Sequence, residues 1–479
     1  MEENDEKMDK KLQGYEFWEK TLGKPSLVVA PMVDQSELAW RMFSRKYGAH
    51  LCYTPMFHAS VFTRNVQYRK DALTSCDGDR PLIVQFCANN PDVLIQAALM
   101  AQDHCDAIDI NLGCPQTIAR RGYYGAFLAD NWPLVEKLVK VCHERLKIPV
   151  TCKIRIFSDI QKTVDYAKML ERAGCQLLTV HGRTKEMKGP MTGLANWEHI
   201  KAIKEALSIP VFANGNIQYK KDIERCMKVT GVDGVMTAEG NLHNPMLFIG
   251  GKPVIWEMAF EYLDYVEKYP PCPTSYARGH VFKLCHHGLR FHTEARDLLS
   301  ASRNIFEMRK AVEKLQELCK GTCWKESDGS DSAAKDKLPF QHWFCQPYVR
   351  PPPKKKTDQK NTKTDDSSGA TVNDLNISKK KMKKLKKRGH NVNDFTSLNP
   401  DQKAAKIAKF LSSNQPTKIV YDDCVRCGNP RGNKCVLLCC KPCCKVRMRD
   451  TEVICPAHKN FKKLERRKLN SGINQNQQT

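Results

Sequence analysis

Residues 150–182 read VTCKIRIFSDIQKTVDYAKMLERAGCQLLTVHG and contain the repeating unit of the predicted fold. Two short apolar segments, Val150–Arg155 and Leu177–Gly182, flank a segment, Thr163–Ala173, whose apolar residues recur at helical spacing. A strand, a helix and a second strand in this order predict a βαβ unit with two parallel strands.

The same alternation extends in both directions, from Leu27 to Glu239. Further strands are predicted at Leu27–Ala30, Ala49–Tyr53, Leu82–Phe86, Ala107–Asn111, Val211–Gly215 and Gly234–Glu239. Further helices are predicted at Leu38–Tyr47, Pro91–Gln102, Pro133–Leu146, Trp197–Leu207 and Lys220–Val229. Strands that are apolar on both faces and separated by helices predict a parallel sheet. Eight such strands favour an α/β fold of the (β/α)8 TIM barrel type over a doubly wound open sheet, with the site at the carboxyl ends of the strands.

The chain continues well beyond the predicted barrel. Helical spacing over Trp256–Val266, Val281–Leu289 and Ile305–Leu318 predicts a small all-helical domain. A segment rich in Pro, Lys, Ser and Asp then predicts disorder. We therefore expect an N-terminal tail (1–20), the barrel (21–252), the helical domain (253–350), a basic disordered linker (351–419), a cysteine-rich module (420–460) and a disordered tail (461–479).

Positive charge is concentrated in the C-terminal part. The chain has a formal net charge of +24, of which residues 1–353 carry only +5. Residues 354–388 contain 13 Lys and Arg against 4 Asp and Glu, and residues 420–468 contain 13 against 5. A nearly neutral body with a basic tail predicts a polyanionic partner such as nucleic acid. An anionic membrane surface fits less well, because no apolar anchor or lipidation motif accompanies these charges.

No stretch resembles a secretory signal or a membrane span, so we expect a soluble protein in the cytoplasm or the nucleus. No coiled coil or apolar interface patch can be read from the sequence, so we expect a monomer. The chain has 22 cysteines. In a reducing compartment, cysteines serve metal binding or catalysis more often than disulfide bonds.

One cysteine lies in a distinctive loop. Residues 108–126 read IDINLGCPQTIARRGYYGA and begin in a predicted strand. Gly113 and Pro115 are expected to turn the chain sharply and lift Cys114 into the mouth of the barrel, although a free cysteine can also serve as a buried filler. This stretch closely resembles the signature of the tRNA-dihydrouridine synthase family, and the resemblance extends to about Leu318.

The resemblance implies an FMN enzyme that reduces uridine in tRNA with NADPH or NADH. Within the family, the sequence most resembles the eukaryotic branch that acts on positions 16 and 17 of the tRNA D-loop. Cys114 is implied as the proton donor. The implied FMN contacts are Pro31, Met32, Val33, Gln85, Lys153, His181, Asn214, Gly215, Asn216, Ala238 and Glu239. The implied substrate contacts are Asn111, Arg183 and Arg120.

Some of these roles have alternatives. Asn111 suits either flavin or uracil, His181 suits flavin or RNA, and Arg120 with Arg121 suits RNA phosphates or solvent. Ala238–Glu239 departs from the family pattern, which usually has arginine there. A carboxylate does not bind phosphate, so backbone N–H groups would have to do so at that point.

The chemistry agrees with these roles. Reducing uracil adds hydride at C6 and requires an acid at C5, and a thiol with a pKa of about 8.5 holds a proton at neutral pH yet can give it up. Lys153 would place a positive charge beside flavin N1 and O2. No GxGxxG signature is present, so the nicotinamide is expected to use the same pocket.

The target uracil must leave its stack to enter the pocket. We expect the helical domain and the basic tail to hold the RNA, with candidate contacts at Arg278, Lys283, Arg290 and Arg296. Each of these side chains is equally suited to a solvated helix face.

Eight of the 22 cysteines lie in Cys424–Cys455, in pairs that suit tetrahedral thiolate coordination. The predicted zinc ligands are Cys424, Cys427, Cys435, Cys439, Cys440, Cys443, Cys455 and His458. An iron–sulfur cluster, or a set of unpaired thiols, is the alternative. The spacing leaves the partition of ligands between two ions open.

Two other functions compete with tRNA reduction. One is a flavin barrel acting on a small pyrimidine, as a dihydroorotate dehydrogenase does, but a small substrate needs neither the basic tail nor the cysteine module. The other is a non-catalytic RNA-binding scaffold, which the intact set of Cys114, Lys153, Gln85 and Asn111 disfavours.

Overall fold

The computed structural model describes residues 11–323 and 338–349, and in the C-terminal part residues 422, 424–426, 431, 435–450 and 455–456. The chain divides into two compact units, 1–354 and 355–479. In the second unit the described helix is α19 (Lys441–Asp450).

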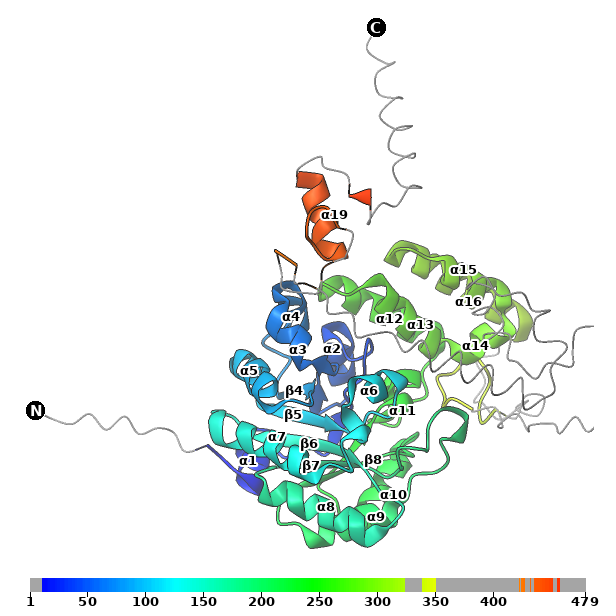
Figure 1. Ribbon diagram of the computed structural model, residues 1–479. Helices are drawn as coiled ribbons and strands as arrows, with labels where there is room; N and C mark the ends of the chain where they lie inside the picture. Colours follow the sequence, from blue (N-terminus) through cyan, green and yellow to red (C-terminus); the bar gives the residue numbers. More distant parts are fainter. Residues whose placement is uncertain are drawn as a thin grey trace, which may run out of the picture. The chain divides into compact units, whose positions relative to one another are not determined.

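The first unit is built on a closed parallel barrel (Figure 1). Its strands are β1 (Leu27–Val29), β2 (Leu51–Tyr53), β4 (Leu82–Cys87), β5 (Ala107–Leu112), β6 (Val150–Arg155), β7 (Leu178–His181), β8 (Val211–Asn214) and β9 (Gly234–Thr237). Each pairs in parallel with its neighbours, and the β2–β4 and β1–β9 pairings close the ring. A further two-residue strand, β3 (Phe57–His58), pairs with the end of β4. The barrel prediction is confirmed, and the open sheet is wrong.

Helices and short 3-10 turns surround the strands (Figure 1). They are α2 (Leu38–Lys46), α3 (Ala59–Arg64), α4 (Val66–Ala72), α5 (Pro91–Ala101), η1 (Gln102–His104), α6 (Thr117–Gly122), η2 (Gly125–Phe127), α7 (Trp132–Arg145), α8 (Ile160–Arg172), η3 (Gly189–Met191), α9 (Trp197–Ala206), α10 (Lys220–Thr230), α11 (Glu239–His243) and η4 (Pro245–Leu247). Several helices begin at side-chain caps: Asn90, Asn131, Asp159 and Asn196, for example, accept hydrogen bonds from backbone N–H groups of α5, α7, α8 and α9.

The amino-terminal end of the barrel is closed by α1 (Gly14–Lys20). Phe17 is fully buried in a cluster with strand residues such as Val28 and Phe212. The backbone N–H of Gly14 donates to Gln176 Oε1 at 2.9 Å, just before β7. Residues 14–20 are therefore an ordered part of the barrel, although we assigned them to the tail, because their apolar side chains are too few for a clear helical pattern.

Within residues 253–323 the barrel is followed by the helices α12 (Ile255–Lys268), α13 (Thr274–Leu284), α14 (His286–Phe291), α15 (Thr293–Ala301) and α16 (Ile305–Cys323). The segment predicted as one helix over Val281–Leu289 is divided between α13 and α14. These helices contact the barrel at α2, where Tyr262 Oη donates to Glu37 Oε1 at 2.8 Å and His280 Nε2 lies 3.0 Å from Glu37 Oε2.

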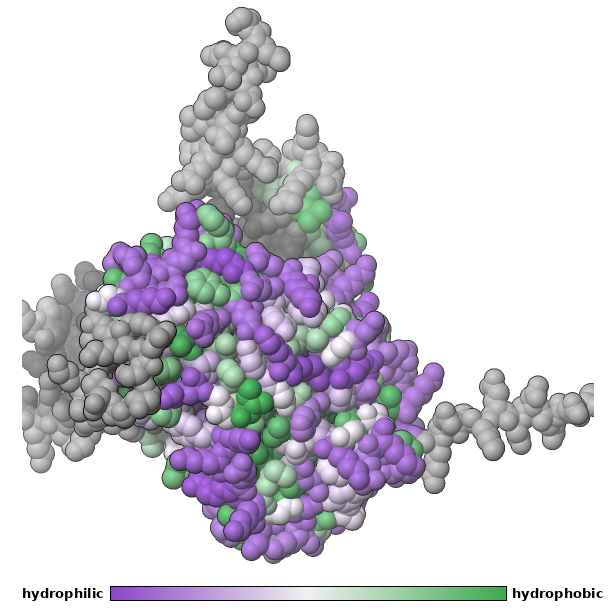
Figure 2. Space-filling view, turned by 180° about the vertical axis from the view of Figure 1, so that it is seen from behind, coloured by the Kyte–Doolittle hydropathy of each residue, from purple (hydrophilic) through white to green (hydrophobic). Residues whose placement is uncertain are grey.

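The segment 338–349 returns to the start of α12. Ile255 N donates to Trp343 O at 3.0 Å, and Cys345 N donates to Pro253 O at 2.8 Å. Figure 2 shows a mainly hydrophilic outer face on which hydrophobic side chains form small separate areas. Among the described residues, no helix has the length and hydropathy that a bilayer span requires.

Candidate functional site

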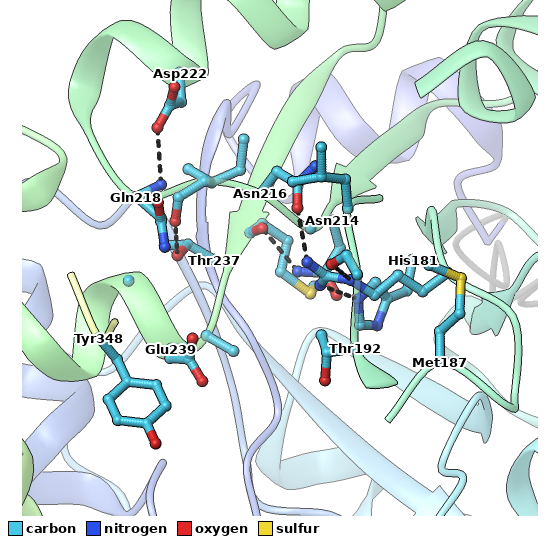
Figure 3. A pocket seen from close by; sticks show the side chains of 18 of the residues that line it. His181, Met187, Thr192, Asn214, Asn216, Gln218, Asp222, Thr237, Glu239 and Tyr348 are labelled. Atoms are coloured by element: carbon cyan, nitrogen blue, oxygen red, sulfur yellow. Dashed lines mark hydrogen bonds between the residues drawn. The ribbon is translucent and has the colours of Figure 1, made fainter. Parts of the chain in front are cut away.

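A cavity of about 750 Å³ lies at the carboxyl ends of β6 to β9. Its lining comes from Arg155, from the loops after β7, β8 and β9, and from Pro115 and Gln116 beside Cys114. Figure 3 shows His181, Asn214 and Asn216 on one side of it, and Glu239 with Tyr348 on another. This is the end of a parallel barrel at which active sites are built.

Asn111, the last polar residue of β5, shapes the loop that holds Cys114. Its Oδ1 accepts hydrogen bonds from Cys114 N at 2.9 Å and from Gly113 N at 3.2 Å. The thiol is half-buried against the cluster of Cys87, Ala119 and Tyr124, and the next two residues, Pro115 and Gln116, line the cavity. Asn111 therefore positions Cys114 through its oxygen.

Gly125 explains the Gly-Ala pair at the end of the motif. It has a φ of +63°, and a Cβ there would lie 2.8 Å from Cys114 O and 3.0 Å from Cys114 Cβ. Ala126 N donates to Cys114 O at 3.1 Å. Glycine is thus required for η2 to pack directly against the cysteine.

Replacing Gly125 with alanine should displace Cys114. We expect activity to fall by at least about tenfold, because a small shift of a reacting group costs that much or more. The Gly231→Ala variant is the matched control: its φ of +70° imposes similar backbone strain, but nothing lies within 4 Å of its Cβ. Equal activity loss in both variants would contradict the steric argument; a turnover assay with thermal melting of each variant decides it.

The electrostatic surroundings favour a protonated Cys114. Burial raises the pKa of the thiol, and Arg155, Lys153 and Lys188 offset this only in part. A thiol that keeps its proton at neutral pH is suited to act as an acid rather than as a nucleophile.

A buried chain of hydrogen bonds supports Asn111 from inside the barrel. Asn111 Nδ2 donates to Gln85 Oε1 at 2.8 Å, and Gln85 Nε2 donates to Asp109 Oδ2 at 2.7 Å. Thr151 Oγ1 donates to the other oxygen of Asp109 at 2.7 Å. Burial raises the pKa of Asp109 to about 6, against the opposing effects of these hydrogen bonds and of Lys153. Both ends of the Gln85 amide are thus engaged within the protein.

Lys153 lies on β6 next to this chain. Its Nζ donates to Asn214 Oδ1 at 2.9 Å, and Asn214 Nδ2 in turn donates to Met236 O at 2.9 Å. Burial, and then Arg155, lower the pKa of Lys153 to about 8. The site therefore holds an ammonium group whose charge an anionic ligand would stabilise.

Arg183 joins the loops after β7 and β8. Its guanidinium donates to His181 Nε2 at 3.0 Å and to Asn216 Oδ1 at 2.7 Å. Because arginine can only donate, the neutral His181 ring carries its proton on Nδ1. Burial, with the nearby Lys153, Arg155 and Arg183, holds the pKa of His181 well below its ordinary range. Arg183, predicted as a substrate contact, thus lies with the predicted flavin contacts.

The loop after β8 approaches the loop after β9 closely at Gly240 and the loop after β7 closely at Gly215. A Cβ on Gly240 would lie 2.3 Å from Ile217 O, and one on Gly215 would lie 2.7 Å from Ala195 Cβ. This leaves backbone groups facing the cavity, which Ala238 and Glu239 also line. Lys221 and Arg225 line the same cavity, and Arg225 pairs with Asp222, another lining residue, at 3.2 Å. Neither was predicted, since both lie on the first turns of α10 in an ordinary charged pattern.

Arg155 is a further residue that the sequence prediction missed. Its Nε donates to Gly113 O at 3.0 Å, and its Nη1 donates to Thr184 O at 2.7 Å. It therefore ties the Cys114 loop to the loop after β7, with help from Lys188, whose Nζ donates to Pro115 O at 2.6 Å. Arg155 stands two residues after Lys153 on the same strand face, a spacing that could have indicated it.

Other predicted residues lie around the cavity rather than on its lining. Pro31, Met32 and Val33 follow β1, where Met32 N donates to Ser36 Oγ at 3.0 Å. Val33 lines a second cavity of about 420 Å³ together with residues of α2 and α13. Arg120 is exposed on α6, just after the Cys114 loop.

Six of the described cysteines of the second unit form two groups of three. Thiols of Cys424, Cys440 and Cys443 lie within 4.8 Å of one another, as do those of Cys435, Cys444 and Cys455. Cys444 was not among the predicted ligands, and within the part of the module that the structure describes, Cys439 belongs to neither trio. The predicted ligands Cys427 and His458 lie outside the described residues.

The fold and the cavity place this chain among the (β/α)8 barrel enzymes. Residues 28–332 match the family Dihydrouridine synthase (Dus). The chain is 52% identical over 458 residues to a Mus musculus protein named tRNA-dihydrouridine(16/17) synthase NAD(P)(+)-like, covering 94% of this chain and 90% of that one. It is 44% identical over 369 residues to the Saccharomyces cerevisiae tRNA-dihydrouridine(16/17) synthase, covering 71% and 87%. The chain belongs to the dihydrouridine synthase family.

Proposed function

We propose that this protein is an NAD(P)H-dependent flavoenzyme that reduces the C5–C6 double bond of uridine at positions 16 and 17 of tRNA. The observation that carries this proposal is the position of Cys114: Asn111 holds its backbone N–H, burial raises the pKa of its thiol, and the next two residues, Pro115 and Gln116, line a large cavity. The relatives of matching length are named for this tRNA position.

The cavity fits FMN in size and in chemistry. Its volume falls in the range of about 300–1,000 Å³ that small-molecule sites occupy. Lys153 and Asn214 would hold the polar edge of the flavin ring, and Gly215, Asn216, Ala238 and Glu239 would contribute backbone groups around the phosphate. Because Glu239 stands where the family usually has arginine, the positive charge for the phosphate would come from Arg183, Lys221 and Arg225. When bound, FMN supplies the hydride, which it receives from NADPH or NADH.

The protein's own residues handle the proton. Cys114 Sγ gives its proton to C5 of the uracil, and the cations around it stabilise the thiolate that is left. Asn111, which is hydrogen-bonded to Gln85, holds the Cys114 loop at the end of β5. Arg155 connects the same loop to the loop after β7. Met32, which follows β1, packs against the core clusters of the barrel.

FMN affinity should depend on pH through Lys153. Its pKa is about 8, so the ammonium is charged below that value and neutral above it. Because an anionic ligand prefers the charged form, the dissociation constant should rise with pH, by up to about tenfold per unit above about pH 8. Titration of FMN into the protein measures this. The same pH slope in Lys153→Met would contradict the assignment.

A tRNA is much larger than the cavity, so it would also contact parts of the protein outside the barrel. Arg290 and Arg296 are exposed on α14 and α15, and with Arg278 and Lys283, both half-buried, they are proposed to contact the RNA backbone. Arg120 is proposed to contact it near Cys114. The basic linker would add affinity without sequence preference. A tRNA substrate suits residence in the cytoplasm or the nucleus.

The cysteine module is proposed to bind two zinc ions. The two thiol trios would each provide three ligands, with Cys427, Cys439 and His458 as the further candidates. Structural zinc sites take four thiolate or imidazole ligands in a tetrahedron. The arginines and lysines among these cysteines would then face RNA on an ordered module.

Competing substrates test the proposed class. The purified protein, reduced with NADPH, should be reoxidised by unmodified tRNA and not by uridine, uracil or orotate. Reoxidation by a small pyrimidine alone would favour the dihydroorotate dehydrogenase-like alternative. A protein that binds tRNA but no flavin would favour the alternative of a non-catalytic RNA-binding scaffold.

A further inference from the structure

The helical domain contains a cluster of metal-ligand side chains that the proposed reaction does not use. The ligand atoms of His292, Cys319 and His342 all lie within 4.8 Å of one another. His292 lies between α14 and α15, Cys319 lies on α16, and His342 lies on the returning segment 338–349. Three separate parts of the chain thus bring two imidazoles and a thiol to one point.

The distances suit a tetrahedral ion. With Zn–N bonds of about 2.0–2.1 Å, two imidazole ligands of zinc stand about 3.3 Å apart. His292 Nε2 and His342 Nε2 are 3.2 Å apart. A simple hydrogen bond between the two rings would give a similar distance, but it would not account for a thiol at the same point.

The burial of the three groups is also that of a structural site. Cys319 is fully buried, and both histidines are half-buried. Soft thiolate and imidazole ligands together select zinc over magnesium or calcium. A fourth ligand would be water or a further residue.

We infer that His292, Cys319 and His342 bind one Zn²⁺ ion, which ties the segment 338–349 to the helices α14 to α16. This site is separate from the cysteine module and does not depend on the proposed reaction. Zinc that binds only the folded domain adds its binding free energy to the stability of that domain.

The ion would also support one wall of the cavity. Tyr348, six residues after His342, lines the cavity and stacks on His243 at the end of α11, with ring centroids 5.7 Å apart. Tyr348 also meets the His286 ring of α14 edge-on, at 5.0 Å. Holding His342 therefore holds the segment that places Tyr348 beside the loop after β9.

The test measures bound zinc in the full-length protein. To remove the background, all variants carry serine in place of every cysteine of the module, namely Cys424, Cys427, Cys435, Cys439, Cys440, Cys443, Cys444 and Cys455. On this background we expect one zinc per chain by mass spectrometry, and a loss of that zinc in His292→Asn and in His342→Asn. Both substitutions replace half-buried side chains, so folding should survive them.

Matched controls separate ligation from packing. His199→Asn removes a buried histidine of α9 that contacts Thr163, and Cys142→Ser removes a fully buried thiol of α7; both should keep the zinc. With Co²⁺ in place of zinc, a thiolate-to-metal absorption band should appear and vanish in Cys319→Ser. Equal metal content in the background protein and in both histidine variants would overturn the site, whatever the activity toward tRNA.

Discussion

Cys114→Ala should lower the rate of dihydrouridine formation by roughly 10²–10⁴-fold, the range that a positioned acid contributes. The alanine cannot protonate C5, and no other described thiol lies in the same loop. FMN content, tRNA affinity and the rate of flavin reduction by NADPH should be nearly unchanged, because these steps do not use the proton. Rapid-mixing kinetics of the two half-reactions separate these effects.

Cys87→Ala is the control for this substitution. Cys87 lies at the end of β4 in the small hydrophobic cluster against which Cys114 packs, and burial raises the pKa of its thiol to about 12. Its loss should cost some stability and little activity. If Cys114→Ala kept more than about a tenth of the wild-type rate, the acid role would be wrong.

Lys153→Met should have the second-largest effect. Methionine keeps much of the length of the side chain but removes the ammonium that donates to Asn214. Loss of a hydrogen bond to a charged group costs about 1.5–3 kcal/mol, so FMN affinity should fall by roughly 10- to 100-fold. Flavin reduction should slow as well, because the positive charge beside the ring is gone. Fluorescence titration of FMN and stopped-flow reduction by NADPH measure the two effects.

Lys201→Met controls for the loss of a charge elsewhere. Lys201 is exposed on α9, 3.9 Å from Glu205, and its replacement should leave FMN affinity within about twofold, since exposed charge pairs contribute little. An unchanged affinity in Lys153→Met would remove this lysine from the flavin site.

Much of the barrel could be predicted because the strands are short, mostly apolar and separated by long helices with a recurring apolar spacing. The short helices α3 and α4 could not, since Val66–Ala72 buries none of its residues and so has no apolar period. The break between α13 and α14 was missed because the apolar spacing continues across Cys285.

Site residues that belong to one short sequence motif could be predicted, whereas contacts between residues far apart in the sequence could not. Cys114 and Gly125 belong to one motif, and their contact explains it. The hydrogen bonds from Asn111 to Gln85 and from Gln85 to Asp109 connect the strands β4 and β5. The sequence does not reveal that both ends of the Gln85 amide are already hydrogen-bonded. His292, Cys319 and His342 are 27 and 23 residues apart, without the short spacing by which metal ligands are usually found.

The central claim is tested most directly by mapping the product. The protein, loaded with FMN, is incubated with NADPH and an unmodified tRNA, and dihydrouridine is then located position by position. We expect dihydrouridine at positions 16 and 17 and at no other uridine of the D-loop. Dihydrouridine at a different position would contradict the assigned specificity, and a tRNA left unmodified while NADPH is oxidised would contradict the proposed reaction.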